Sequence, residues 1–135
     1  MLKLYTAPGT CALATHIALA EAGADVALAG RSEPTETLAL VSATGRKAVN
    51  IKADLSSTEP VQRVVDEALA GLGRIDVLVN NAGIIRRDDL LNFSEADWDA
   101  VMDTNLKTLF FLSQAAARHM AERGSGKIVN IASLL

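Results

Sequence analysis

Short apolar and β-branched runs alternate along the chain with longer segments in which apolar residues recur every three or four positions. Runs of the first kind predict strands, and segments of the second kind predict helices. The run at Ile75–Val79 is almost wholly apolar, which is typical of a strand that helices cover on both faces. The pattern predicts five strands, at Lys3–Thr6, Asp25–Ala29, Val49–Ile51, Ile75–Val79 and Lys127–Ala132.

Four helices are predicted between these strands. The clearest is Val61–Leu72, whose apolar side chains share one helical face. Ser94, with Asp97 three residues later, is a capping-box-like start for the last helix, and Ser32 is a candidate cap for the second. With their caps and terminal glycines, the helical segments are Thr10–Gly23, Ser32–Gly45, Val61–Leu72 and Ser94–Glu122.

The resulting order alternates strands and helices and closes on a fifth strand, with no internal repeat and no linker. Right-handed crossovers between successive strands then give a parallel sheet with helices on both faces. We therefore predict one α/β domain over residues 1–135, with a Rossmann-like doubly wound parallel sheet of five strands. In such sheets, ligands bind outside the carboxyl ends of the strands.

Composition and charge argue against several other classes of protein. Half of the 135 residues are hydrophobic, which is too many for a disordered chain. The formal net charge of −3, without a basic block, argues against nucleic-acid and membrane partners. A single cysteine, the lack of a long apolar run and an N-terminal stretch unlike a signal peptide predict a cytoplasmic protein. No set of potential ligands has metal-site spacing, so we expect no metal.

Polar motifs follow the predicted strands at the ligand-binding edge. Asn80-Asn81-Ala82-Gly83 follows the fourth strand, Asp54-Leu55 follows the third, and Ser133 follows the fifth. Asn105 lies in the last helix. From about residue 24 to residue 135, these motifs in this order resemble the short-chain dehydrogenase/reductase family.

This resemblance implies NAD or NADP as the cofactor of an oxidoreductase. It implies that Asp54 and Leu55 contact the adenine and that Asn81, Ala82 and Gly83 line the cofactor. It also implies two catalytic residues, Asn105, which supports a proton-relay water, and Ser133, which hydrogen-bonds the substrate carbonyl. The wider sequence resembles family members that act on the hydroxyl or ketone of a sugar acid, so the expected partner is a small-molecule sugar acid.

Each of these residues also has a purely structural interpretation. The segment 80–83 can be an ordinary turn, Asp54 a loop acid or a helix cap, and Ser133 a common serine after a strand. Asn105 shares its predicted helix face with Trp98 and other apolar residues, so its side chain needs a hydrogen-bond partner whether its role is structural or catalytic.

The charged residues near the strand ends bear on specificity. Arg31 closes the second strand, where an NAD site usually has an acid that binds the ribose hydroxyls. An arginine there can pair with a 2′-phosphate, which favours NADP, or it can remain solvated. Arg86 and Arg87 can likewise meet the carboxylate of an acidic substrate or form a solvated pair.

Two features depart from the family pattern. The family has TGxxxGxG after the first strand, and Thr6, Thr10 and Ala12 stand at its three glycine positions here. Glycine allows a tight turn and close approach of the backbone to pyrophosphate, whereas threonine disfavours positive φ. These three residues remain candidate cofactor-binding positions, but we expect a steep loss of affinity.

The second departure concerns the family's proton donor, the Tyr of a YxxxK motif that follows the Ser. The only tyrosine is Tyr5, and Gly9 stands four residues after it. We therefore expect a C-terminally truncated domain without dehydrogenase turnover. Its exposed fifth strand, with Phe110 and Phe111, favours a homo-oligomer, and a non-catalytic remnant is one alternative.

Residues 1–23 resemble a different family, the bacterial beta-class glutathione transferases, through Pro8-Gly9-Thr10-Cys11 and the segment that ends at Gly23. That resemblance implies a thiol at the start of a helix that contacts glutathione, and a thiol in this position can be nucleophilic. A glutathione-binding protein that uses Cys11 is thus a second alternative. The simpler interpretation of Cys11 is a small, half-buried residue.

Overall fold

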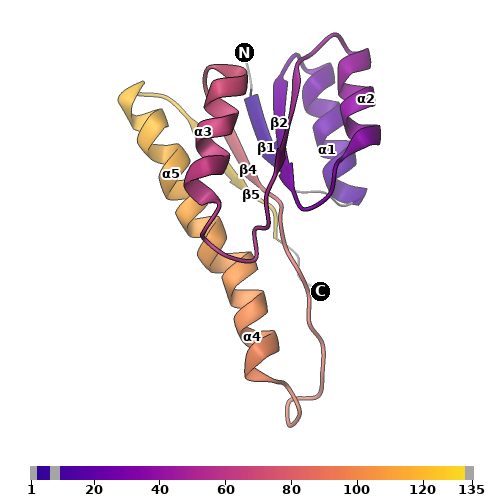
Figure 1. Ribbon diagram of the computed structural model, residues 1–135, viewed down its shortest axis with the longest axis vertical. Helices are drawn as coiled ribbons and strands as arrows, with labels where there is room; N and C mark the ends of the chain where they lie inside the picture. Colours follow the sequence, from indigo (N-terminus) through magenta and orange to yellow (C-terminus); the bar gives the residue numbers. More distant parts are fainter. Residues whose placement is uncertain (1–2, 7–9, 133–135) are drawn as a thin grey trace.

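The computed structural model describes residues 3–6 and 10–132, and the side chains of residues 13–132. Strands and helices alternate as the sequence pattern predicts (Figure 1). In chain order the elements are β1 (Lys3–Thr6), α1 (Thr10–Glu21), β2 (Asp25–Gly30), α2 (Thr35–Ala43), β3 (Ala48–Lys52), α3 (Val61–Leu72), β4 (Val77–Asn80), α4 (Glu95–Met102), the π-helical η1 (Asp103–Thr108), α5 (Leu109–Glu122) and β5 (Lys127–Asn130).

Every strand pair within these residues is parallel. Hydrogen bonds join β1, β2 and β3 into one group and β4 and β5 into another. Since β1 also lies against β4, the strands follow the order β3-β2-β1-β4-β5 (Figure 1). The predicted α/β Rossmann-like fold with parallel strands is thereby confirmed.

The helices form two layers, with α1 and α2 on one face of the sheet and α3 and α5 on the other (Figure 1). The side chains of β2 pack alternately into the two layers, because successive side chains of a strand point to opposite faces of the sheet. Val26 and Leu28 belong to the core beneath α1 and α2, whereas Ala27 and Ala29 belong to the core beneath α3 and α5. A sheet buried on both faces explains why the central strands are continuously apolar.

The last strand and the last helix are more open. All residues of β5 are exposed, and Ile128 and Val129 retain 40% and 42% of their accessible surface. The α4, η1 and α5 segments run on as one long helix that projects beyond the sheet (Figure 1). No helix in the described ranges is long and apolar enough to cross a membrane.

Two predicted helix caps are wrong. Helix α2 begins at Thr35, with Pro34 rather than Ser32 at the N-cap, because a proline disfavours helical backbone at the residue before it. Helix α3 likewise begins after Pro60, so Asp54 is not its cap. The predicted cap of α4 is confirmed, because the Ser94 side chain accepts a hydrogen bond from the Asp97 N–H.

The predicted apolar face of the last helix, which includes Trp98, is also wrong at the N-terminal end of that helix. Trp98 is 58% exposed, whereas Leu112 is buried. Helix α4 buries none of its residues, because the long helix projects beyond the sheet there and Trp98 has no core to pack against. Both limits of β4 and the end of β5 also shift, because the β4–β5 ladder runs only from Val77↔Lys127 to Asn80↔Asn130.

Candidate nucleotide-binding site

A groove of about 560 Å³ lies at the carboxyl ends of β2, β3 and β4. It falls in the size range of small-molecule sites and is flanked by the long helix. The groove brings together five predicted cofactor-binding residues, namely Arg31, Asp54, Leu55, Ala82 and Gly83. Its remaining lining residues are Gly30, Ser32, Ala53, Ser56, Ile84, Arg86, Ala100 and Thr104.

Asp54 is the acid of this groove, on the exposed turn that follows β3. The backbone N–H of Ser56 donates a hydrogen bond of 3.0 Å to Asp54 Oδ1. This bond, a hydrogen bond with the Ser56 side chain and the charge of Arg31 hold the pKa of Asp54 below its ordinary value. The carboxylate is therefore ionised at neutral pH and accepts hydrogen bonds only.

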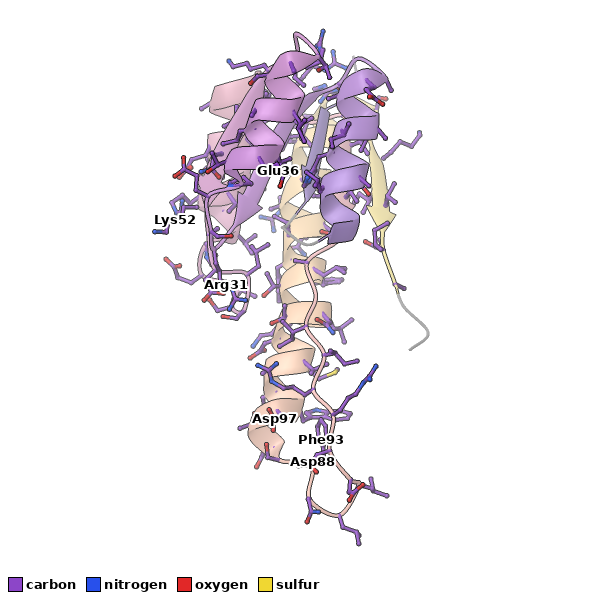
Figure 2. All side chains as sticks on the ribbon, turned by 90° about the vertical axis from the view of Figure 1, so that its right-hand side faces the viewer. Arg31, Glu36, Lys52, Asp88, Phe93 and Asp97 are labelled. Carbon is purple, nitrogen blue, oxygen red and sulfur yellow. The ribbon has the colours of Figure 1, made fainter. Side chains whose placement is uncertain are left out.

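Arg31 directly follows β2 on the same side of the sheet. Figure 2 shows it at the end of the sheet from which the long helix projects. Its side chain is exposed, and its charge lies close enough to the Asp54 carboxylate to lower the pKa of that group. An exposed arginine in this position can pair with an anionic group of a ligand.

Asn105 is fixed by the backbone of the loop after β4. Its Nδ2 donates to the Ile84 carbonyl, and its Oδ1 accepts from the Ile84 N–H, each at 2.8 Å. The expectation that Asn105 needs a hydrogen-bond partner is met by loop backbone. A Cβ on Gly83 would lie 3.4 Å from Asn105 Oδ1, so a larger residue at position 83 would crowd this pair.

The end of β4 is held by Asn80, the first residue of the Asn80–Gly83 motif, whose bonds to other elements the motif did not predict. Asn80 is buried, and its Nδ2 donates to Ser113 Oγ at 2.9 Å and to Asn130 Oδ1 at 2.8 Å. These bonds join β4 to α5 and β5. The neighbouring Asn81 lines a smaller recess under the groove, together with Leu55 and Ala82.

Arg86 was predicted to be either a substrate contact or a solvated residue, and the structure places it on the wall of this groove. Its Nε lies 3.2 Å from Asp97 Oδ1, and its Nη1 donates to the Ile85 carbonyl at 3.2 Å. The sequence offered no sign of the pairing with Asp97, because this partner lies on another element. Ala100 and Thr104 were missed for the same reason.

Several predicted site residues lie wholly or partly outside the described structure. Thr6 ends β1, and Thr10 and Ala12 lie in the first turn of α1, but only their backbone is described. The same holds for Cys11, and Ser133 lies outside the described residues. The roles of these residues stay predictions. Within the part of the chain that is described, no cluster of His, Cys, Asp and Glu could hold a metal ion.

The lining of the groove combines apolar and charged side chains. Leu55, Ala82 and Ala53 are among its apolar residues, and Asp54 and Arg31 contribute a hydrogen-bond acceptor and a cation. A parallel α/β sheet with a groove across its carboxyl edge is the arrangement of a dinucleotide-binding protein. The family model described as short chain dehydrogenase matches residues 7–135, and the chain belongs to this family.

Two curated relatives share one name, 2-dehydro-3-deoxy-D-gluconate 5-dehydrogenase. The protein of Escherichia coli (strain K12) is 51% identical over 120 residues, which cover 88% of this chain and 47% of that protein. The protein of Bacillus subtilis (strain 168) is 44% identical over 135 residues, which cover 98% and 52%.

A solved structure from Agrobacterium tumefaciens, provisionally named 2-deoxy-d-gluconate 3-dehydrogenase and holding NADP, is similar with a TM-score of 0.84 and 43% identity. The match covers 98% of this chain and 53% of that one. The chain thus spans about half the length of the relatives it matches.

Proposed function

We propose that the groove binds the adenosine part of NAD or NADP, and that the chain carries the cofactor-binding segment of a sugar-acid oxidoreductase. The observation that carries this proposal is the meeting of Arg31, Asp54 and Gly83, from the ends of three different strands, around one groove of about 560 Å³. The bound cofactor would supply or accept the hydride.

Different residues of the groove bind different parts of the cofactor. Asp54, ionised and held by Ser56, accepts a hydrogen bond from the amino group of the adenine. Leu55 and Ala82 provide the apolar walls against which the base packs. Gly83 has no side chain, so the cofactor can approach the backbone there closely.

Arg31 favours NADP over NAD. Its guanidinium is exposed at the edge of the groove, and a guanidinium pairs with a phosphate through two parallel hydrogen bonds. The relative from Agrobacterium tumefaciens holds NADP, which supports this preference. A cytoplasmic location agrees with the single cysteine of the sequence.

The substrate is proposed to be a sugar acid of the 2-dehydro-3-deoxy-D-gluconate or 2-deoxy-D-gluconate class, and the names of the relatives support this. Asn105, held on the loop by Ile84, would support a proton-relay water, and Ser133 would hydrogen-bond the substrate carbonyl. The 135 residues contain no YxxxK pair, so we expect no turnover from this chain alone.

Isothermal titration with NADP and with NAD tests the proposal. We expect NADP to bind about tenfold or more tightly, and Arg31→Ala to abolish that difference. Arg118→Ala is the matched control, because Arg118 contacts only Gln114 on the outside of α5. A chain that binds neither nucleotide would refute the proposal, as would binding that does not change when Asp54→Ala and Arg31→Ala are combined.

A further inference from the structure

The acid of the groove lies on a turn whose backbone is anchored in the core. Ala53 and Leu55 are buried, with 4% and 7% of their surface exposed, and the Ala53 N–H donates to the Gly30 carbonyl of β2 at 2.9 Å. Asp54 and Ser56, which alternate with these two residues, are exposed and line the groove. The core therefore fixes the turn, and the two polar residues face the groove from it.

Ser56 holds the Asp54 carboxylate by two hydrogen bonds. Its backbone N–H donates to Asp54 Oδ1 at 3.0 Å, and its hydroxyl forms a second hydrogen bond with the same side chain. These two bonds lower the pKa of Asp54 more than the charge of Arg31 does. The direction of the carboxylate is therefore set chiefly by Ser56, two residues further along the same turn.

Holding the carboxylate in advance makes it a better acceptor for a ligand. An exposed side chain that a ligand must first immobilise loses rotamer freedom on binding, and bonds already present in the free chain reduce that cost. An ionised carboxylate has about four lone-pair sites, and the bonds from Ser56 leave some of them free. These free sites can only accept hydrogen bonds, so they favour a ligand that presents a donor.

We propose that Ser56 is a positioning residue, which directs the Asp54 carboxylate at the 6-amino group of the bound adenine and makes the groove selective for 6-aminopurines. This rests on the proposed function, since it assumes an adenine nucleotide beside Leu55 and Ala82. A purine without the amino group brings no donor to the carboxylate. Such a base displaces water from the carboxylate without replacing the hydrogen bonds that the water made, and it therefore binds more weakly.

The selectivity is tested by displacing bound NADP with adenosine 5′-monophosphate and with purine riboside 5′-monophosphate. The two nucleotides differ only at position 6 of the base, where the second has a hydrogen in place of the amino group. We expect the unaltered chain to bind the first about tenfold more tightly, because a hydrogen bond to a charged acceptor is lost with the second. Asp54→Ala, which removes the acceptor, should abolish this difference.

The role of Ser56 is tested by the ratio of the two affinities. Ser56→Ala removes the hydroxyl, so it should lower the ratio about threefold by weakening adenosine 5′-monophosphate alone. Ser56→Thr keeps the hydroxyl and should keep the ratio. In the Asp54→Ala background, Ser56→Ala should have no further effect. Ser57→Ala, which changes an exposed neighbouring serine outside the lining of the groove, is the matched control.

Three results would overturn the role of Ser56. These are a ratio that Ser56→Ala leaves unchanged, an equal weakening of both nucleotides by Ser56→Ala, and a Ser56→Thr chain that behaves like Ser56→Ala. If the unaltered chain does not bind NADP, the proposed function itself fails and this proposal fails with it. If it binds NADP but binds the two nucleotides equally well, only the selectivity and the role of Ser56 fail.

Discussion

Asn105 and Ile84 are joined by two hydrogen bonds of 2.8 Å, in which one side-chain amide pairs with both polar groups of one backbone residue. Asn105 lies in η1, and Ile84 lies in the loop that leaves β4. The pair therefore ties the long helix to the loop that forms one wall of the groove. It gives the asparagine a structural role that operates with or without a bound substrate.

Asn105→Leu should remove both bonds and leave the half-buried Ile84 backbone unpaired. We expect a loss of about 1–3 kcal/mol in the free energy of unfolding, together with weaker nucleotide binding, because the groove wall loses its anchor. Urea denaturation measures the first effect and titration with NADP the second. Asn92→Leu, at an exposed loop position, is the control. Unchanged stability would show that the two bonds contribute nothing net.

The buried His16 on α1 should make the free energy of unfolding depend on pH. It is 3% exposed, neither ring nitrogen has a hydrogen-bond partner, and burial lowers its pKa from the ordinary 6.5 to about 4. Between these two values, the unfolded chain binds a proton that the folded chain does not. The stability contributed by neutral His16 is thus fully present above pH 6.5, is lost as the pH falls, and levels off below about 4.

The expected loss from His16 between pH 7 and pH 4 is about 3 kcal/mol at most. His16→Leu should flatten this part of the curve of unfolding free energy against pH, measured by urea denaturation at successive pH values. His119→Leu, which changes the other histidine, should leave the curve steep. Parallel curves for His16→Leu and the unaltered chain would contradict the assignment.

Asp76 joins the start of β4 to the end of α5. It accepts hydrogen bonds from Arg123 Nη2 at 2.6 Å and from Arg74 Nε at 2.8 Å, and Arg123 Nη1 also donates to the Ile75 carbonyl at 2.9 Å. Burial raises the pKa of Asp76, but the bonds from the two arginines outweigh it, so the pKa lies below its ordinary value. The carboxylate is therefore charged in the folded chain.

Asp76→Asn should lower the free energy of unfolding by about 1–3 kcal/mol, because it leaves the partly buried Arg123 without its anion. The loss should shrink as the pH falls through the native pKa, since the unaltered Asp76 is then protonated too. Asp66→Asn on the exposed face of α3 is the control, because Gln62 can still hydrogen-bond an amide there. Equal stability of the two variants in urea would rule out a net contribution from the Arg123–Asp76 pair.

The sequence predicts the residues at the strand ends better than it predicts contacts between distant elements. The strands and α3 follow from periodicity, and the strand-end residues Arg31, Asp54 and Gly83 meet because parallel strands end at one edge. Arg86 and Asn80 depend on partners on other elements, which no local pattern specifies. No local pattern shows that α4 projects beyond the sheet, so Trp98 was wrongly predicted to lie on a buried face.

The exposed aromatic pair Phe110 and Phe111 leads us to expect that two copies of the chain associate. Both are exposed on α5, at 57% and 41%, and their rings form a T-shaped pair with centroids 5.4 Å apart. Leu106, one turn earlier, is 55% exposed, so the three side chains make a continuous apolar patch on the long helix. A second copy of the chain could cover this patch, and the exposed β5 offers unpaired backbone groups for a further contact.

Light scattering after size-exclusion chromatography should therefore show a concentration-dependent dimer. Replacing both aromatics, as Phe110→Ser with Phe111→Ser, should shift the chain toward the monomer, because each buried aromatic contributes about 2–3 kcal/mol to such an interface. Leu40→Ser is the matched control, since Leu40 is 39% exposed on α2, which belongs to the opposite helical layer. A monomer at every concentration would mean that this patch does not bind a second copy, and a dimer that persists in the double variant would point to β5 instead.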